Sequence, residues 1–337
     1  MNLLLTLSPL FKHFPIFAQD NRIAGIRLNS AMSTLTDLDN EIQTINAVKT
    51  KTPLLFDIKG RQLRIETVEG DKDNLELVLN HEVRCKTPQT VLFKAGLDAA
   101  LLKEIKGNRL IFEGGPQFKV VSGESIYIRD PNLEIIGPIF TSKELLKIEK
   151  VKSSFNKYFL SYVEDQSDID LFLELVGKDS EVWLKIESRR GLSFVANKFK
   201  KLSNLKLVAA RGDLYVEIDR PHQIGEALRL IIEKDPEACV ASRILLSIGE
   251  TAIPNKILDQ LRFEMKSPVN FDRLKEISMK ILSRSSGNLV PSCADFLELE
   301  ALRNMGYKHY MLCDEICLDS KLLNAAVGAF DAFRSSK

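Results

Sequence analysis

The feature that most constrains this chain of 337 residues is the alternation of short apolar runs with helical segments. Strands that alternate with helices form right-handed βαβ units and a parallel sheet. The runs are apolar on both faces, which indicates a sheet covered by helices. Eight such units predict a closed (β/α)8 TIM barrel, an α/β fold. The eight runs are residues 3–8, 22–29, 52–60, 157–165, 181–188, 205–213, 237–242 and 307–315.

Residues 62–132 interrupt this alternation. Their apolar and polar residues alternate with a period of two, and Gly and Asp punctuate the runs, as in short strands joined by turns. Residues 97–105 are the exception, because their pattern is compatible with a short helix. We therefore predict a small β-rich, barrel-like domain, residues 62–132, inserted after the third strand. Residues 1–61 and 133–337 would form the barrel domain.

A second interruption, residues 243–288, separates the seventh strand from the eighth. Residues 252–265 and 270–286 have the periodicity of amphipathic helices. Their apolar faces need a partner surface. The outside of the same barrel is the favoured partner, a second copy of the chain would make a homo-oligomer, and a third interpretation has these helices border the substrate pocket.

Composition excludes several classes of protein. The 47 basic and 46 acidic residues give a formal net charge of +1, which argues against a nucleic-acid partner. No apolar run reaches the length of a membrane span, so no membrane association is expected. The five cysteines are odd in number and scattered, which favours a reducing cytoplasm over a disulfide framework.

Polar residues stand where the predicted strands end, the place where barrel enzymes build their active sites. Lys185 and Glu187 lie two apart on one strand and therefore share a face with Trp183. A lysine beside the acids Glu187 and Asp213 suits a divalent cation and an anion. Taken singly, each residue is more commonly a solvated loop residue. The strand-end residues are Arg27, Asn29, Asp57, Lys59, Ser161, Lys185, Glu187, Arg211, Gly212, Asp213, Ser242 and Glu315.

Several stretches resemble motifs of the pyruvate kinase family. "LKIESRRGL" is similar to that family's "KIEN" strand, and "VAARGDLYVEID" is similar to "MVARGDLGVEIP". "GIRLNSA" resembles "ARLNFSHG", and "LLFDIKGRQLR" resembles "LLDTKGPEIR". The matches occur in the family's order and cover most of the chain outside the two interruptions. The inserted β domain also stands where the family has its mobile lid, whereas the family's C-terminal regulatory domain has no counterpart.

The resemblance implies a substrate site for phosphoenolpyruvate, pyruvate or a related keto-acid. Lys185 would face the bridging phosphate oxygen and the enolate oxygen. Glu187 and Asp213 would hold Mg²⁺ or Mn²⁺, and the amides near Gly212 and Asp213 would bind the substrate carboxylate. Arg27 would bind the transferred phosphoryl group. Phosphoryl transfer depends mainly on such positioning and charge neutralisation.

The resemblance also implies a monovalent-cation site made by Asn29 and Asp57, with Ser161 close by. Two departures argue against a K⁺ requirement. Ala31 stands where the family has a serine ligand, and Gln62 replaces an acid.

The nucleotide side of the site carries further implied residues and departures. Arg64 and Lys59 would contact the phosphates of ADP or ATP, and Ser242 stands near the carbon that is protonated. Met32 replaces a histidine near the nucleotide, and Tyr215 replaces a glycine near the substrate.

We therefore expect a phosphotransferase of pyruvate kinase type, acting through a metal-stabilised enolate and placed in glycolysis. The alternatives are a barrel with enolising or aldolase-like activity and no kinase activity, or an inactive metabolite-binding protein. Retained charges at positions 185, 187 and 213 favour an enzyme, because a scaffold has no need of buried charges there.

Overall fold

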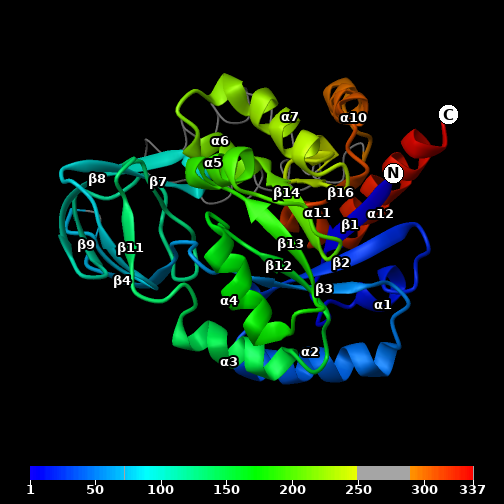
Figure 1. Cartoon of the computed structure of the whole chain (residues 1–337), viewed down its shortest axis with the longest axis horizontal. Coiled ribbons are helices and arrows are strands. Elements are labelled where there is room, and N and C mark those ends of the chain that lie inside the picture. Colours follow the sequence, from blue (N-terminus) through cyan, green and yellow to red (C-terminus); the bar gives the residue numbers. More distant parts are fainter. Residues whose placement is uncertain (72, 249–288, 337) are drawn as a thin grey trace, which may run out of the picture.

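The computed structural model describes residues 1–71, 73–248 and 289–336, and it contains a closed barrel of eight parallel strands (Figure 1). Around the barrel the order is β1-β16-β15-β14-β13-β12-β3-β2. This confirms the predicted fold class and all eight predicted strands. The strands are β1 (Asn2–Thr6), β2 (Ile23–Asn29), β3 (Leu54–Ile58), β12 (Lys157–Leu160), β13 (Glu181–Ile186), β14 (Leu205–Ala210), β15 (Cys239–Ala241) and β16 (His309–Met311).

Helices surround the barrel and bury one apolar face each against the outward-facing strand residues. Capping boxes fix where four of these helices begin, with Thr34, Thr141, Asp165 and Ser292 as the N-cap residues. The longer helices are α2 (Leu35–Val48), α3 (Ser142–Val151), α4 (Gln166–Val176), α5 (Arg189–Asn197), α7 (Ile224–Lys234), α10 (Cys293–Met305) and α12 (Ser320–Ser335). The short ones are α1 (Phe14–Phe17), α6 (Arg211–Glu217) and α11 (Asp314–Cys317).

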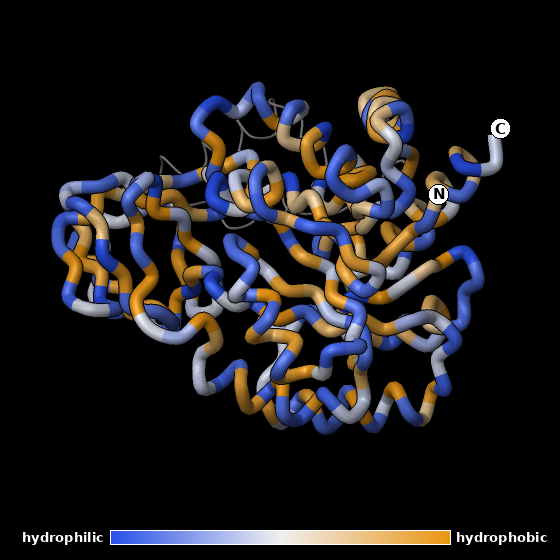
Figure 2. Tube along the Cα trace, in the orientation of Figure 1, coloured by the Kyte–Doolittle hydropathy of each residue, from blue (hydrophilic) through white to orange (hydrophobic). Residues whose placement is uncertain are grey.

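The barrel interior is a packed core of its own, separate from the layer between strands and helices. Trp183 belongs to it, and its ring lies 5.4 Å from that of Phe159. Because side chains alternate along a strand, Lys185 shares this inward face at the carboxyl end of β13. The hydropathy colours show hydrophobic residues recurring along the barrel strands (Figure 2). The interior cluster is Leu4, Leu55, Phe159, Trp183, Val208, Cys239, Ala241 and Met311.

The β-rich segment after β3 lies to one side of the barrel (Figure 1). It forms an antiparallel sheet in the order β10-β7-β8-β9-β5-β4, and a two-stranded sheet of β11 and β6. Its buried core includes Leu77, Phe93, Leu102 and Phe112. The strands are β4 (Ile65–Glu69), β5 (Glu76–Leu79), β6 (Glu82–Arg84), β7 (Gln89–Phe93), β8 (Asp98–Lys106), β9 (Arg109–Glu113), β10 (Tyr127–Ile128) and β11 (Glu134–Ile136).

Residues 97–105, which have a pattern compatible with a helix, form most of strand β8 instead. β8 pairs with β7 on one side and with β9 on the other, so the sheet satisfies its backbone groups. The predicted domain boundary at residue 132 stays a proposal, and β11 beyond it pairs with β6 inside the β-rich segment.

The long connection after β15 is described only as far as residue 248 and again from residue 289. The helices predicted at residues 252–265 and 270–286, with their apolar faces, lie outside the described residues. In the described part of the chain, no helix has both the length and the apolar character needed to span a bilayer.

Candidate active site

The stretch "VAARGD" marks an abrupt change from strand to helix. Strand β14 ends at Ala210, and α6 begins at the next residue, Arg211. The Arg211 side chain is buried and lies away from the mouth of the barrel. Its Nε donates a hydrogen bond to the carbonyl oxygen of Ser242 at 3.1 Å, and its guanidinium pairs with Glu298 of α10. Arg211 therefore ties the segment after β15 to the outer helices.

That segment has an unusual backbone. Ser242, Arg243 and Leu245 have φ angles of 69°, 59° and 54°, in the left-handed region that residues other than glycine seldom adopt. Such strain persists only where surrounding contacts enforce it, and it is common at functional sites. Burial of Leu245 and the Arg211 contacts supply that enforcement. Ser242 and Arg243 consequently line the barrel mouth.

The barrel mouth contains a cavity of about 320 Å³. Five cationic side chains reach it, together with the acids Asp213, Asp314 and Glu315. Most of the residues predicted for the site line this cavity, namely Arg27, Asn29, Lys59, Arg64, Lys185, Gly212, Asp213 and Ser242. Three others, Asp57, Ser161 and Glu187, are buried and absent from its lining.

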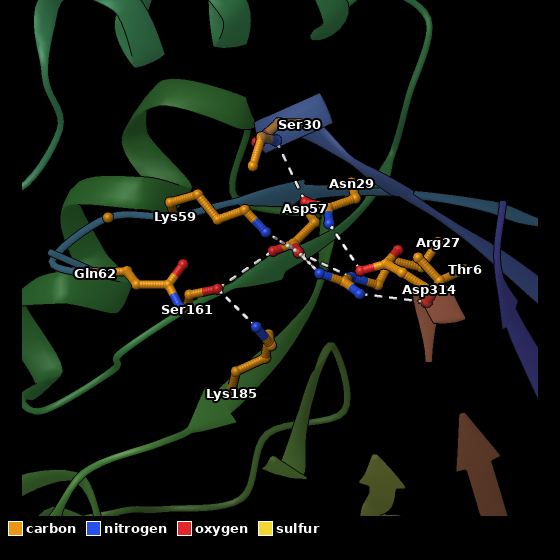
Figure 3. A network of polar contacts seen from close by, with 12 residues as sticks. Thr6, Arg27, Asn29, Ser30, Asp57, Lys59, Gln62, Ser161, Lys185 and Asp314 are labelled. Carbon is orange, nitrogen blue, oxygen red and sulfur yellow. Dashed lines mark hydrogen bonds and ion pairs between the residues drawn. The ribbon is translucent and has the colours of Figure 1, made fainter. Parts of the chain in front are cut away.

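Asp57 is the centre of the polar network in the mouth (Figure 3). Its Oδ2 accepts from Arg27 Nε at 2.8 Å and lies 2.6 Å from Lys59 Nζ, while its Oδ1 accepts from Ser161 Oγ at 3.3 Å. Burial opposes ionisation of this carboxyl, but the charges of Arg27 and Lys59 outweigh it and hold the pKa of Asp57 below its usual range. Asp57 is thus an ionised, fully buried carboxylate with two cationic partners.

Lys185 and Glu187 form the second part of the network. Lys185 Nζ lies 2.6 Å from Glu187 Oε1 and donates to Ser161 Oγ at 2.9 Å. Glu187 Oε2 accepts from the backbone amide of Tyr162 at 2.8 Å. Burial raises the pKa of Glu187 to about 7, with Lys185 opposing the shift and Asp213 adding to it. Glu187 and Asp213 therefore lie close enough to interact electrostatically, and both lie near Lys185.

Glu187 and Asp213 suit a divalent cation in number and chemistry. Mg²⁺ is usually held by one or two carboxylates, completed by oxygens of substrate and water. Among the described residues, no group of three or more His, Cys, Asp and Glu side chains is placed to hold a metal ion. Oxygens from a ligand would therefore have to complete the coordination.

The residues predicted for a monovalent cation already have partners. Both oxygens of Asp57 are engaged by Arg27, Lys59 and Ser161. Asn29 donates its side-chain amide to Asp314 Oδ2 at 3.2 Å. Lys59 thus occupies the space beside Asp57, although burial lowers the pKa of its ammonium group to about 7. The predicted cation site stays a prediction.

On the nucleotide side, Arg64 reaches the mouth from the start of the β-rich segment. Its Nε donates to Gln62 Oε1 at 2.9 Å, so the residue that replaces an acid positions this arginine. Arg64 and Lys59 both line the cavity, and their contact with nucleotide phosphates stays a prediction.

Sequence reasoning missed three residues of the mouth. Tyr127, from strand β10, donates its hydroxyl to Asp213 Oδ1 at 2.7 Å. No local pattern reveals such a contact, because it depends on how the β-rich segment docks. Arg243 looked like the beginning of a long connection. Asp314 stands beside Glu315, three residues after strand β16 ends at Met311, so its place near a strand end was a signal for it.

Comparisons with known proteins agree with the resemblance seen in the sequence. No protein-family model matches the chain. It is 22% identical over 272 residues to a curated pyruvate kinase from Thermoplasma acidophilum, which covers 70% of this chain and 46% of that protein. The chain thus spans about half the length of this relative. The crystal structure of pyruvate kinase from Pyrobaculum aerophilum matches all of this chain and 73% of its own, with a TM-score of 0.67 and 12% identity. The chain is therefore pyruvate kinase-like in sequence and in fold.

Replacing Arg211 tests its positioning role. Arg211→Met leaves Glu298 and the carbonyl oxygen of Ser242 without their partner, so we expect a loss of about 1–3 kcal/mol in the free energy of unfolding. Denaturant titration measures this. Arg84, whose ion pair with Glu134 is exposed, is the control, and Arg84→Met should cost less than about 1 kcal/mol. Equal losses in the two variants would contradict the role of Arg211.

Proposed function

We propose that this protein is an enzyme of pyruvate kinase type, which transfers a phosphoryl group from phosphoenolpyruvate to ADP, or the reverse, through a pyruvate enolate. The observation that carries the proposal is the cluster of Lys185, Glu187 and Asp213 at the carboxyl ends of adjacent strands. A lysine kept charged beside two carboxylates serves chemistry in which negative charge develops on a substrate oxygen.

The charged residues of the mouth and the amides of α6 would bind different groups of the substrate. Arg27 and Lys185 bring positive charge to the mouth and neutralise the phosphoryl group and the enolate oxygen. Lys185 is held in place by Ser161 and Glu187, so its ammonium is positioned before the substrate arrives. Gly212 and Asp213 lie in the first turn of α6, whose amides have no partners within the helix and can bind the substrate carboxylate.

Glu187 and Asp213 would hold Mg²⁺ or Mn²⁺, which when bound supplies further positive charge to the phosphoryl and enolate oxygens. Ser242 stands against Gly212, since a Cβ at position 212 would lie 3.5 Å from Ser242 Oγ. This places a hydroxyl beside the proposed carboxylate site, where it can orient a water for protonation of the enolate carbon. Arg64 and Lys59 are the candidates for contact with the nucleotide phosphates.

A second candidate function is enolisation or an aldolase-like reaction on a keto-acid without phosphoryl transfer. The observation that favours it is Asp314, which pairs with Asn29 and faces the charge of Arg27. A carboxylate there repels a phosphoryl group at Arg27. The two functions share the metal and Lys185, and they differ in whether ADP is phosphorylated.

The first prediction concerns the metal. Glu187→Gln and Asp213→Asn remove a hard anionic ligand, so each variant should fold and bind Mn²⁺ at least tenfold more weakly, because a single lost ligand costs more than about 1.4 kcal/mol. Electron paramagnetic resonance measures free Mn²⁺ directly. Glu315→Gln is the control, because Glu315 lines the same mouth outside the proposed ligand set. Unchanged Mn²⁺ affinity in both variants would remove the metal assignment.

The second prediction concerns Lys185. Lys185→Met should lower the rate by about 10² to 10³, the usual effect of losing one electrostatic contact to a developing oxyanion. Two assays report it, phosphorylation of ADP by phosphoenolpyruvate and metal-dependent exchange of pyruvate methyl protons into deuterated water. Mn²⁺ affinity should be retained. Exchange in the wild type without ADP phosphorylation would select the second candidate function, and a fully active variant would contradict both.

The third prediction concerns K⁺. Arg27, and Lys59 in its protonated form, already supply positive charge at Asp57, so activity should be similar in K⁺, Na⁺ and choline salts at equal ionic strength. The measurement is the steady-state rate against salt concentration. A large, saturable activation specific to K⁺ would show that a cation enters the network.

A further inference from the structure

A second cavity, of about 240 Å³, lies between the β-rich segment and the barrel, beside the end of β12 and the start of α5. The barrel wall is polar and includes Tyr162, Glu164, Ser188 and Glu217. The wall from the β-rich segment and its return to the barrel is mostly apolar, and consists of Leu63, Ile126, Ile128, Pro131, Leu133 and Ile135. This cavity shares no lining residue with the mouth of the barrel.

Glu217, at the end of α6, is the unusual group of this cavity. It is partly buried, and among the described residues its carboxyl has neither a hydrogen-bond partner nor an ion-pair partner. Burial, and then the neighbouring carboxylates Glu164 and Asp213, raise the pKa of Glu217 to about 7, and the charges of Arg189 and Arg129 oppose this shift. An ionised carboxylate that is removed from water and has no partner is unfavourable. A cation bound beside Glu217 would therefore stabilise its ionised form.

The arginines that line the cavity have their own ion-pair or hydrogen-bond partners elsewhere, although the charge of Arg189 still acts on Glu217. Arg61 pairs with Asp168 at 2.8 Å, and Arg189 pairs with Asp219 at 2.7 Å. Arg190 is exposed and reaches the carbonyl oxygen of Pro131 at 3.4 Å. The other two acids that line the cavity already accept hydrogen bonds, Glu164 from Ser188 Oγ at 2.6 Å and Asp130 from the backbone amides of Lys86 and Asn132.

We propose that this cavity is a binding site for a small primary amine with an apolar body. The ammonium group would pair with Glu217, and the apolar body would lie on the wall formed by the β-rich segment. An ammonium group has three donors and no acceptor, which matches a carboxyl that lacks donors. A bare metal ion would leave the apolar wall without a contact.

The cavity is also connected to the barrel mouth through two shared elements. Helix α6 has Gly212 and Asp213 at the mouth and Glu217 at the second cavity. Tyr162 lines the second cavity, while its backbone amide donates to Glu187. A ligand in this cavity therefore contacts the β-rich segment, α6 and the residue that holds Glu187. The binding proposal itself does not depend on the reaction proposed above.

Three probes of the same length and different charge test the proposal, namely hexylamine, 1-hexanol and hexanoate at pH 8. Ligand-observed NMR titration of the full chain measures saturable binding. We expect hexylamine to bind about tenfold or more tightly than 1-hexanol, because a hydrogen bond to a charged group contributes about 1.5–3 kcal/mol. Hexanoate should bind most weakly.

Two variants locate the site. Glu217→Gln should lose the preference for hexylamine over 1-hexanol, whereas the control Glu226→Gln, which removes an exposed carboxylate from α7, should keep it. Leu133→Ala trims the apolar wall and should weaken hexylamine and 1-hexanol alike. Absence of saturable hexylamine binding, equal affinity for 1-hexanol, or an unchanged preference in Glu217→Gln would each overturn the proposal.

Discussion

The active-site end of the barrel depends on one buried carboxylate. Asp57 is fully buried on β3, and such a charge is tolerated only when cations and donors surround it. Its partners come from β2, from the end of β3 itself and from the end of β12, so one group joins three neighbouring strands. Ser161 also accepts a hydrogen bond from Lys185 on β13, which extends the network to a fourth strand. The positions of the cations in the mouth follow from this single requirement.

Helix α6 has several roles because it begins immediately where β14 ends. Arg211 points outward and fixes the strained segment that contains Ser242. The following residues, Gly212 and Asp213, face the mouth, and Glu217 faces the second cavity. The helical periodicity of one short element thus distributes a structural arginine, two site residues and an unpaired carboxyl to three different places.

The β-rich segment takes part in the site through contacts that bridge it to the barrel. Tyr127 donates to Asp213, and Arg64 enters the mouth from the root of the segment. Its core is separate from that of the barrel, so these polar contacts are what the segment adds to the site.

The sequence by itself determined the eight strands and the residues at the strand ends, because the periodicity that predicts a parallel barrel is a local and repetitive property. It also predicted the shared face of Trp183 and Lys185, which follows from the alternation of side chains along a strand. Only the tertiary structure decided that residues 97–105 pair as a strand, that Arg211 faces outward, and that Tyr127 reaches the mouth. These outcomes depend on contacts between residues far apart in the chain, for which a single sequence carries no local signal.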